Sequence, residues 1–510
     1  MGSCTQKLKK VNLENAQKRQ KLKEIQIQNQ KYQQIQSQEQ IQEKRKKKMI
    51  MQNDQSLNIH NFILIQTCKL SKVYSIVSNT NKDNCIQIQG KGLKENIQIM
   101  QNNLTGRIRI METLKWNDKN TQYYIDNLMA NPLSHPNISQ THEMYQDDES
   151  IHIIHDYCSG GSLSSLNLKQ GQGIDEQIAL KVLFQMIESM NYLHIKGFNH
   201  GHLTYKSFSR TDESENYFIK LTDTKPIFIK PQITFEQIQF FAPEIIINDE
   251  EYSIARDVWS IGIIFYKLLT GNLPYVSTQL NKLKLEIRKG IIQYNDLQFD
   301  KISQRSKDFL NTLLQYNPSI RSDLNSIIKS PMYRKLVSQT KQVNKSSTGV
   351  LMNIKQANII QSLFLQFLVS QFCQNQQNEI YLMFNKYDQN GDAKLSKNEI
   401  FELLHQQLRS KDQAQQHVDL IFKAIDTDHN GTIDCNEFIR CIVDRQALIT
   451  TPNLKVIFKL LSNGKGSIHK KRFMQCFSVN QKQADEMFAL ITKSKRITFK
   501  VFSRTMMELV

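Results

Sequence analysis

Asp426-Thr-Asp-His-Asn-Gly-Thr-Ile-Asp-Cys-Asn-Glu437 is the stretch that decides how the C-terminal part of this chain folds. Calcium takes about six to eight oxygen ligands, and a loop of about twelve residues can supply them from alternating positions and a bidentate final glutamate. Gly431 at position 6 permits the positive φ of the sharp turn. The oxygen donors expected at positions 1, 3, 5, 7, 9 and 12 are Asp426, Asp428, Asn430, Thr432, Asp434 and Glu437. We expect a calcium-binding helix–loop–helix, in which Ile433 pairs with a neighbouring loop.

A second loop of the same kind precedes it, from Asp388 to Glu399. Its expected donors are Asp388, Asn390, Asp392, Lys394 through its carbonyl, Ser396 and Glu399. Ala393 stands where the glycine should be, and a Cβ at positive φ costs about 1 kcal/mol, roughly fivefold in affinity. This loop is therefore predicted to bind calcium more weakly, so that the chain holds one or two Ca2+ ions.

Two further repeats follow, marked by Phe458 and Phe488, which correspond to Phe384 and Phe422 ahead of the first two loops. Their shortened loops, near residues 462–468 and 492–497, contain no carboxylate. They are predicted to be structural EF-hands without calcium, so residues 376–510 form an all-α, calmodulin-like domain of four EF-hands.

The remaining chain changes character along its length. From about residue 60 it has short β-rich runs, and after residue 175 amphipathic helical stretches, which together indicate an α+β lobe pair. A polar linker is expected at 338–349 and an apolar helix at 350–373. The predicted parts are a tail (1–55), a bilobal domain (56–335, divided at about 158/159), a linker with a junction helix (336–375) and the EF-hand domain (376–510).

Composition restricts the function classes. No apolar run of about 18 residues and no secretory leader is visible, and eight cysteines without a CxxC pair indicate reduced thiols in the cytoplasm. Residues 1–50 hold 13 Lys/Arg and 4 Glu, so +9 of the net +18 lies in the tail. A basic tail is typical of a solvated arm or a surface anchor, and no nucleic-acid-binding motif accompanies it.

Residues 60–510 resemble the calcium-dependent protein kinase family, in which a Ser/Thr kinase domain, a junction helix and four EF-hands share one chain. The resemblance is carried by five short motifs: His135-Pro-Asn-Ile138, Tyr192-Leu-His194, Phe241-Ala-Pro-Glu244, Asp257-Val-Trp-Ser-Ile-Gly262 and Asn317-Pro-Ser-Ile-Arg321. It implies a bilobal protein-kinase-like fold in which Glu244 and Arg321 pair and Asp257 tethers the catalytic-loop backbone.

The catalytic motifs of that family do not carry over. Phosphoryl transfer depends on charge neutralisation and a glycine-rich cover over the phosphates. The resemblance would place the cover at Ile65–Val73, where Gln66, Cys68 and Ser71 replace its glycines. The remaining degenerate positions would be Gln87 for the strand lysine, Asp126 for its helix glutamate, His202 for the catalytic Asp, Thr204 for the catalytic-loop Lys, Ser207 for the metal Asn, and Asp223, which alone is kept.

These departures predict a pseudokinase, with ATP and Mg2+ not expected as cofactors. Loss of a general base alone costs about 10²–10⁴ in rate. Two rescues stay open: Lys91 or Lys94 could replace the strand lysine, and His202 could act as a base. Nucleotide binding without magnesium also stays open, because the hinge-like segment 156–158 survives, although His155 at the back of the pocket disfavours it.

The N-terminus resembles a dual acylation site, with myristoyl on Gly2 and palmitoyl on Cys4. The myristoylation pattern asks for Ser or Thr at the sixth residue, where this chain has Gln6. With lipids attached, each nearby Lys or Arg would add about 1 kcal/mol of attraction to an anionic membrane surface. The alternative is a free basic arm that contacts an acidic protein surface.

The sequence therefore predicts a cytoplasmic, calcium-binding pseudokinase that acts as a calcium-responsive scaffold or regulator, with protein partners unknown and association with membrane or cytoskeleton an option. Calcium is expected to open an apolar groove for the junction helix. One alternative is a working calcium-dependent Ser/Thr kinase with non-standard catalytic residues. Another is an architectural protein, for example cytoskeletal, with structural calcium sites.

Overall fold

A computed structural model describes much of the chain beyond residue 63. The described residues are 64–66, 70–77, 96–116, 118–131, 133–166, 168, 171–215, 217–228, 233–248, 253–292, 299–334, 357–373, 380–381, 383–384, 387–390, 392–408, 410–426, 430–477 and 479–510. The chain divides into residues 1–57 and 58–510. The predicted tail with Gly2 and Cys4, Gln87, Asp428 and the linker 338–349 lie outside the described residues. Within the described residues, no helix combines the length and the apolarity needed to span a membrane.

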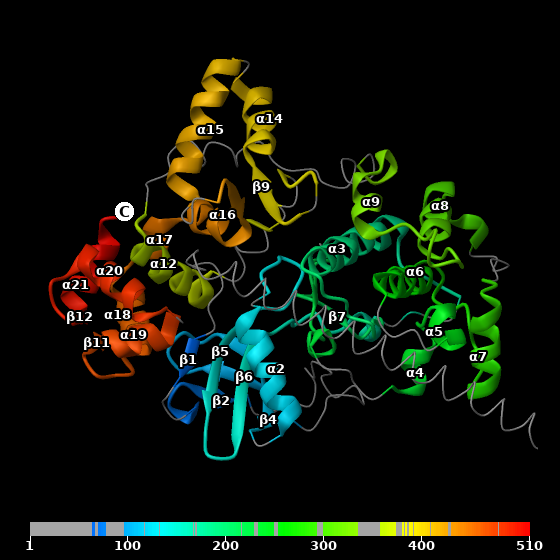
Figure 1. Ribbon diagram of the computed structural model, residues 1–510, viewed down its shortest axis with the longest axis horizontal. Helices are drawn as coiled ribbons and strands as arrows, with labels where there is room; N and C mark the ends of the chain where they lie inside the picture. Colours follow the sequence, from blue (N-terminus) through cyan, green and yellow to red (C-terminus); the bar gives the residue numbers. More distant parts are fainter. Residues whose placement is uncertain are drawn as a thin grey trace, which may run out of the picture. The chain divides into compact units, whose positions relative to one another are not determined.

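The first lobe is a six-stranded sheet in the order β1-β5-β6-β4-β3-β2 with one helix (Figure 1). Only the β1–β5 pairing is parallel. The strands are β1 (Leu64–Gln66), β2 (Tyr74–Ile76), β3 (Ile97–Asn102), β4 (Ile108–Lys115), β5 (Thr141–Gln146) and β6 (Ser150–Asp156), and the helix is α2 (Lys119–Ala130). The Asp118 side chain caps α2 by accepting hydrogen bonds from the Asn120 and Thr121 amides, which satisfies two otherwise unpaired donors.

The second lobe is helical around two helices that are buried on most sides, α3 (Glu176–Ile195) and α6 (Ile254–Thr270). The other helices are α4 (Phe235–Ile238), α5 (Pro243–Asn248), α7 (Leu280–Lys289), α8 (Gln304–Leu313) and α9 (Leu324–Lys329), with the hairpin β7 (Phe208–Arg210) and β8 (Ile219–Leu221). Short 3-10 turns are η1 (Leu70–Lys72), η2 (Leu163–Ser165), η3 (Lys225–Ile227) and η4 (Phe299–Lys301). Gly262 lets α6 approach α8, since a Cβ there would lie 2.6 Å from a methyl carbon of Leu314.

The C-terminal part consists of two EF-hand pairs, each joined by a two-stranded sheet. β9 (Lys394–Ser396) pairs antiparallel with β10 (Thr432–Asp434), and β11 (Ser467–His469) pairs with β12 (Arg496–Thr498). The predicted pairing of Ile433 with a neighbouring loop is thereby confirmed, and its partner is Leu395. The helices are α14 (Lys397–Leu408), α15 (Lys411–Ile425), α16 (Cys435–Ile442), α17 (Arg445–Leu448), α18 (Thr451–Ser462), α19 (Lys470–Phe477), α20 (Gln481–Ile491) and α21 (Phe499–Met507). The α+β class with an all-α C-terminal domain is confirmed.

The junction helix is α12, which runs from Ile359 to Phe372. It lies within the predicted range 350–373. Asn358 and Gln361 form a capping box at its start. Phe364 is fully buried among three rings of the second EF-hand pair, with centroids 4.8 Å from Phe502, 6.0 Å from Phe477 and 6.1 Å from Phe473. The junction helix therefore packs against the second EF-hand pair, and the calcium-dependent opening of a groove for it stays a prediction.

Candidate functional site

The loop from Asp426 to Glu437 is held by its own acidic side chains. The two Asp426 carboxylate oxygens accept the amides of Asn430 (3.0 Å) and Gly431 (2.9 Å), and Gly431 has φ +78°. Asp434 and Glu437 form the capping box that starts α16, each accepting the other's amide at 2.8 and 3.0 Å. Asp428 lies outside the described residues, and the described groups supply the carboxylate and amide oxygens that calcium prefers.

The loop from Asp388 to Glu399 has the same internal scheme. Asp388 accepts the amides of Asp392 (3.2 Å) and Ala393 (2.8 Å), and Glu399 accepts those of Gln389 (2.9 Å) and Ser396 (2.8 Å). Ala393 has φ +61°, the left-handed conformation that its position predicted. The side chain is nonetheless buried, with 5% of its surface exposed.

In this loop, Glu399 is buried, and Asp388 and Asp392 are partly buried. Burial raises the pKa of Asp388 well above its ordinary value, and the charges of Asp392, Glu188 and Glu399 add to the rise. A divalent cation would relieve that repulsion, so the donor chemistry fits calcium. Among the residues that the structure describes, no three His, Cys, Asp or Glu side chains are gathered closely enough to enclose a metal. The carboxylates instead accept hydrogen bonds from loop amides.

The second EF-hand pair keeps the strand pairing of an EF-hand but lacks carboxylate ligands for calcium. Ile468 of β11 pairs with Ile497 of β12, just as Leu395 pairs with Ile433 in the first pair. Neither loop has a carboxylate, and Arg472, at the place of the final glutamate, donates to the Leu461 carbonyl (3.2 Å). The donor chemistry for calcium therefore lies in the first pair.

The bracing residues of the kinase-like lobe lie as the resemblance implied. Arg321 donates to both carboxylate oxygens of Glu244, at 2.7 and 3.1 Å, and its guanidinium lies over the Trp259 ring. Asp257 accepts the amides of His200 (2.9 Å) and Gly201 (2.7 Å). Burial would raise the pKa of Asp257, but a hydrogen bond from His194 and the charges of His194 and His200 hold it below its ordinary value.

The loop that carries chemistry in active kinases is here bonded to itself. The Ser207 hydroxyl accepts the Thr204 amide (3.1 Å), and both residues are buried. His202 is buried with its ring against Phe241, and His200 donates to the Asp223 carbonyl (2.7 Å). The structure thus brings His202, Thr204, Ser207 and Asp223 into one region.

The strand that faces this region carries an acid that the sequence reasoning missed. An active kinase has a lysine on the strand before the helix, paired with a glutamate of that helix. Here that strand is β4, beside the hinge strand β6, and its Glu112 lies 3.3 Å from Lys225 and 4.0 Å from His155. Lys225 stands two residues after Asp223, so the charges are reversed relative to an active kinase. The sequence does contain a signal for these two strands, because the turn residues Thr105-Gly106 separate the alternating apolar runs of β3 and β4.

Two expectations about the first lobe need correction. Asp126 was expected to face the cleft, but it lies on the exposed side of α2, whose buried side presents Tyr124 and Leu128. A cover was expected at 65–73, but β1 lies at the far edge of the sheet, parallel to β5, and Ser71 belongs to η1. The strand next to β4 is β3, which pairs with β2 on its other side, and the sequence between β2 and β3 contains Gly90-Lys91-Gly92, outside the described residues.

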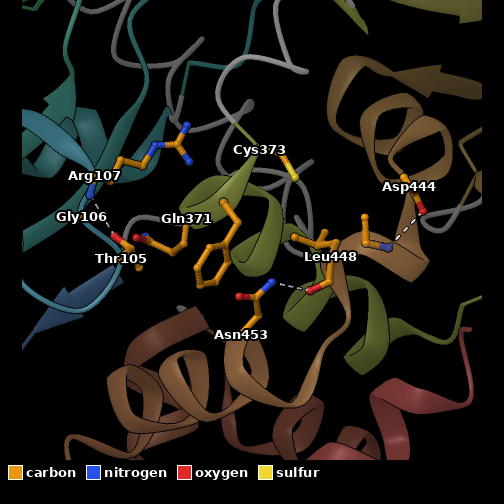
Figure 2. A pocket seen from close by; sticks show the side chains of 10 residues that line it. Thr105, Gly106, Arg107, Gln371, Cys373, Asp444, Leu448 and Asn453 are labelled. Atoms are coloured by element: carbon orange, nitrogen blue, oxygen red, sulfur yellow. Dashed lines mark hydrogen bonds between the residues drawn. The ribbon is translucent and has the colours of Figure 1, made fainter.

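The C-terminal end of α12 contacts the first lobe. Arg107 and Arg109 donate to the Ser370 carbonyl at 2.6 and 2.7 Å, and cations are favourable at a helix C-terminus. Next to this contact is a pocket of about 540 Å³ whose wall includes Arg107, Gln371 and Asp444 (Figure 2). The Gln371 amide also donates to Glu143 of β5 at 3.3 Å, so the junction helix is bonded to two strands.

Comparison with known proteins agrees with this division. The protein kinase domain model matches residues 90–333, and the EF-hand domain pair model matches residues 377–442. The chain is similar to calcium-dependent protein kinase 5 of Plasmodium falciparum (isolate 3D7), with 25% identity over 84% of this chain and 75% of the relative. It is also similar to calcium-dependent protein kinase 4 of Plasmodium berghei (strain Anka), with 27% identity over 69% of this chain and 70% of the relative.

Proposed function

We propose that this chain is a calcium-binding, kinase-like member of the calcium-dependent protein kinase family, and that it is a pseudokinase that works as a calcium-responsive scaffold. The observation that carries this proposal is the Glu112–Lys225 pair, 3.3 Å apart, at the place where an active kinase neutralises phosphate charge. A triphosphate held between β4 and the segment Asp223–Lys225 would meet the Glu112 carboxylate. Lys225 is already paired with that carboxylate.

The internal bonding of the catalytic loop supports the same proposal. Ser207 accepts an amide hydrogen bond at the position of a metal-binding Asn, and a buried His202 replaces the general base. By contrast, Glu244–Arg321 and Asp257, which hold the fold, keep their partners. Selective loss of charge-handling groups from an intact fold favours binding over catalysis.

A calcium-dependent Ser/Thr kinase with non-standard residues is the second candidate. Asp223 and the sequence Gly90-Lys91-Gly92 favour it, since both belong to the phosphate-handling parts of kinases. It predicts calcium-stimulated phosphate transfer that Asp223→Ala abolishes.

Nucleotide binding separates the two candidates. Thermal unfolding of the full chain is expected to show no shift with Mg-ATP, with or without calcium. A ligand at 100 times its Kd would instead stabilise the fold by about 2.7 kcal/mol. Glu112→Ala is the matched variant, because a shift that appears only in this variant would identify the carboxylate as the barrier. A magnesium-dependent shift of the unchanged protein would contradict the pseudokinase assignment.

Calcium response separates a scaffold from a static architectural protein. Limited proteolysis of the full chain is expected to give different cleavage patterns in calcium and in chelator, with the difference at the predicted linker, residues 338–349. The reason is that an opening EF-hand pair would move the junction helix next to this linker. Glu437→Gln serves as the control, since it should reduce the calcium-dependent difference. Identical patterns in calcium and chelator would favour the architectural alternative.

A further inference from the structure

The second EF-hand pair, residues 451–510, carries a net charge opposite to that of the first pair. It contains 12 Lys/Arg and 3 Asp/Glu, so its net charge is +9. Residues 376–450, which include both predicted calcium loops, contain 8 Lys/Arg and 12 Asp/Glu, so their net charge is −4. The field around the second pair therefore repels cations and attracts anions.

Four cations of the second pair lie on its two neighbouring loops and on the strand that follows one of them. They are Lys465, Lys493, Lys495 and Arg496, and all four side chains are exposed. The two loops are adjacent, because His469 of β11 pairs with Arg496 of β12 and the Lys470 amide donates to the Lys495 carbonyl at 3.3 Å. We call these four cations the basic loop face.

The charge of the basic loop face is largely unbalanced. Neither loop contains a carboxylate. Lys470, beside the face, forms an ion pair with Asp485, whereas Lys465, Lys493 and Arg496 have no acidic partner among the residues that the structure describes. Like charges gathered on paired strands disfavour folding, and an anionic partner would offset that cost.

The groove of this EF-hand pair is already filled by the junction helix. Phe364 of α12 lies among the rings of Phe473, Phe477 and Phe502, and the Gln361 amide donates to the Thr505 carbonyl at 2.8 Å. A peptide helix that binds an EF-hand pair inserts its apolar face into this groove. With the groove taken, an anionic partner has to bind the outside of the pair.

An exposed leucine lies next to the basic loop face. Leu490, with 57% of its surface exposed, stands three residues before Lys493 at the end of α20. A membrane surface presents anionic headgroups above apolar acyl chains, so it can bind cations and an exposed apolar side chain together. An acidic protein segment would match the cations but not the leucine.

We propose that the basic loop face docks the second EF-hand pair on an anionic membrane surface, with its cations among the phospholipid headgroups and Leu490 beside the acyl chains. Each Lys or Arg near such a surface strengthens binding about fivefold, so four of them together contribute more than about 100-fold. The docking needs no calcium, because neither loop has a carboxylate to bind it. It also uses a part of the chain that is separate from the N-terminal tail.

Co-sedimentation of the full chain with vesicles tests the proposal. The protein is prepared without acyl groups, and the vesicles contain phosphatidylcholine with or without phosphatidylserine, in chelator. Replacing the four cations of the basic loop face by Gln is expected to weaken binding to the phosphatidylserine vesicles more than about 100-fold. The control variant carries Lys119→Gln, Lys301→Gln, Lys329→Gln and Lys411→Gln, which are exposed lysines outside the second pair. It has the same net charge and should bind like the unchanged chain.

Equal vesicle affinities of the two fourfold variants would overturn the proposal, because net charge alone would then govern binding. Binding of soluble polyglutamate without binding of phosphatidylserine vesicles would also overturn it, and would assign the face to an acidic protein. Should the fourfold variant fail to fold, the double variant Lys493→Gln with Lys495→Gln is expected to bind about 25-fold more weakly, and unchanged binding would contradict the proposal. Since the measurements are made in chelator, the proposed calcium response stands or falls separately.

Discussion

Glu437→Gln is expected to weaken calcium binding at the loop 426–437 by about 100-fold, which corresponds to about 2.8 kcal/mol. Glu437 is fully buried at position 12, where a bidentate carboxylate closes the coordination sphere. Glutamine keeps the size and can still accept the Asp434 amide hydrogen bond, so α16 should still start at the same residue. The charge and one strong ligand are lost, together with the buried ion pair that Glu437 forms with Arg440 (3.9 Å).

Calcium titration of the full chain measures this effect. Glu402→Gln, an exposed acid on α14, is the matched control, for which we expect no change in either site. The titration should show the tighter of two sites replaced by a weak one. Retention of the tight site would mean that the first loop, despite Ala393, is the stronger binder, contrary to the sequence-based ranking.

Arg321→Ala is expected to destabilise the kinase-like domain by about 3–5 kcal/mol, since it leaves the buried carboxylate of Glu244 without its partner. The guanidinium also donates to the Ala255 carbonyl (2.8 Å) and the Gln315 carbonyl (2.8 Å), so backbone acceptors lose their donors as well. For a domain of this size, about 1 kcal/mol shifts the melting temperature by roughly 2–4 °C. The expected fall is therefore about 10 °C.

Differential scanning calorimetry of the full chain checks this value. Lys206→Ala removes an exposed ion pair with Glu236 (2.6 Å) and should cost only about 0–1 kcal/mol. Equal melting temperatures for the two variants would show that the Glu244–Arg321 pair does not brace this lobe. A fall confined to Arg321→Ala would support the inherited bracing role.

The calcium loops were predictable because their chemistry is local. Twelve consecutive residues carry both the ligands and the turn. The spacing from Asp388 to Glu399 therefore predicted the positive φ of Ala393 and placed Leu395 at the position that pairs with Ile433. The bracing pair Glu244–Arg321 could be predicted because each partner sits in a short motif of its own. In each case the evidence lay within a few residues.

The kinase-like positions of the first lobe could not be assigned as well, because their assignment depends on which strands pair. Ile65–Val73 and the segment around Gly90-Lys91-Gly92 both follow β-rich runs, and only the sheet order decides between them. The exposed position of Asp126 depends on how α2 rotates against β4, which its sequence does not specify. The charge of Glu188 contributes to the raised pKa of Asp388, two hundred residues further along the chain, and nothing in the sequence of α3 indicated that influence.

Asn436 immediately precedes Glu437, and its side chain bonds two different parts of the molecule. One end of the amide donates to Ser134, at the entry to the His135-Pro-Asn-Ile138 motif, and the other accepts from Gln366 of α12 (3.0 Å). Any displacement of α16 would therefore act on the lobe and on the junction helix through this one side chain.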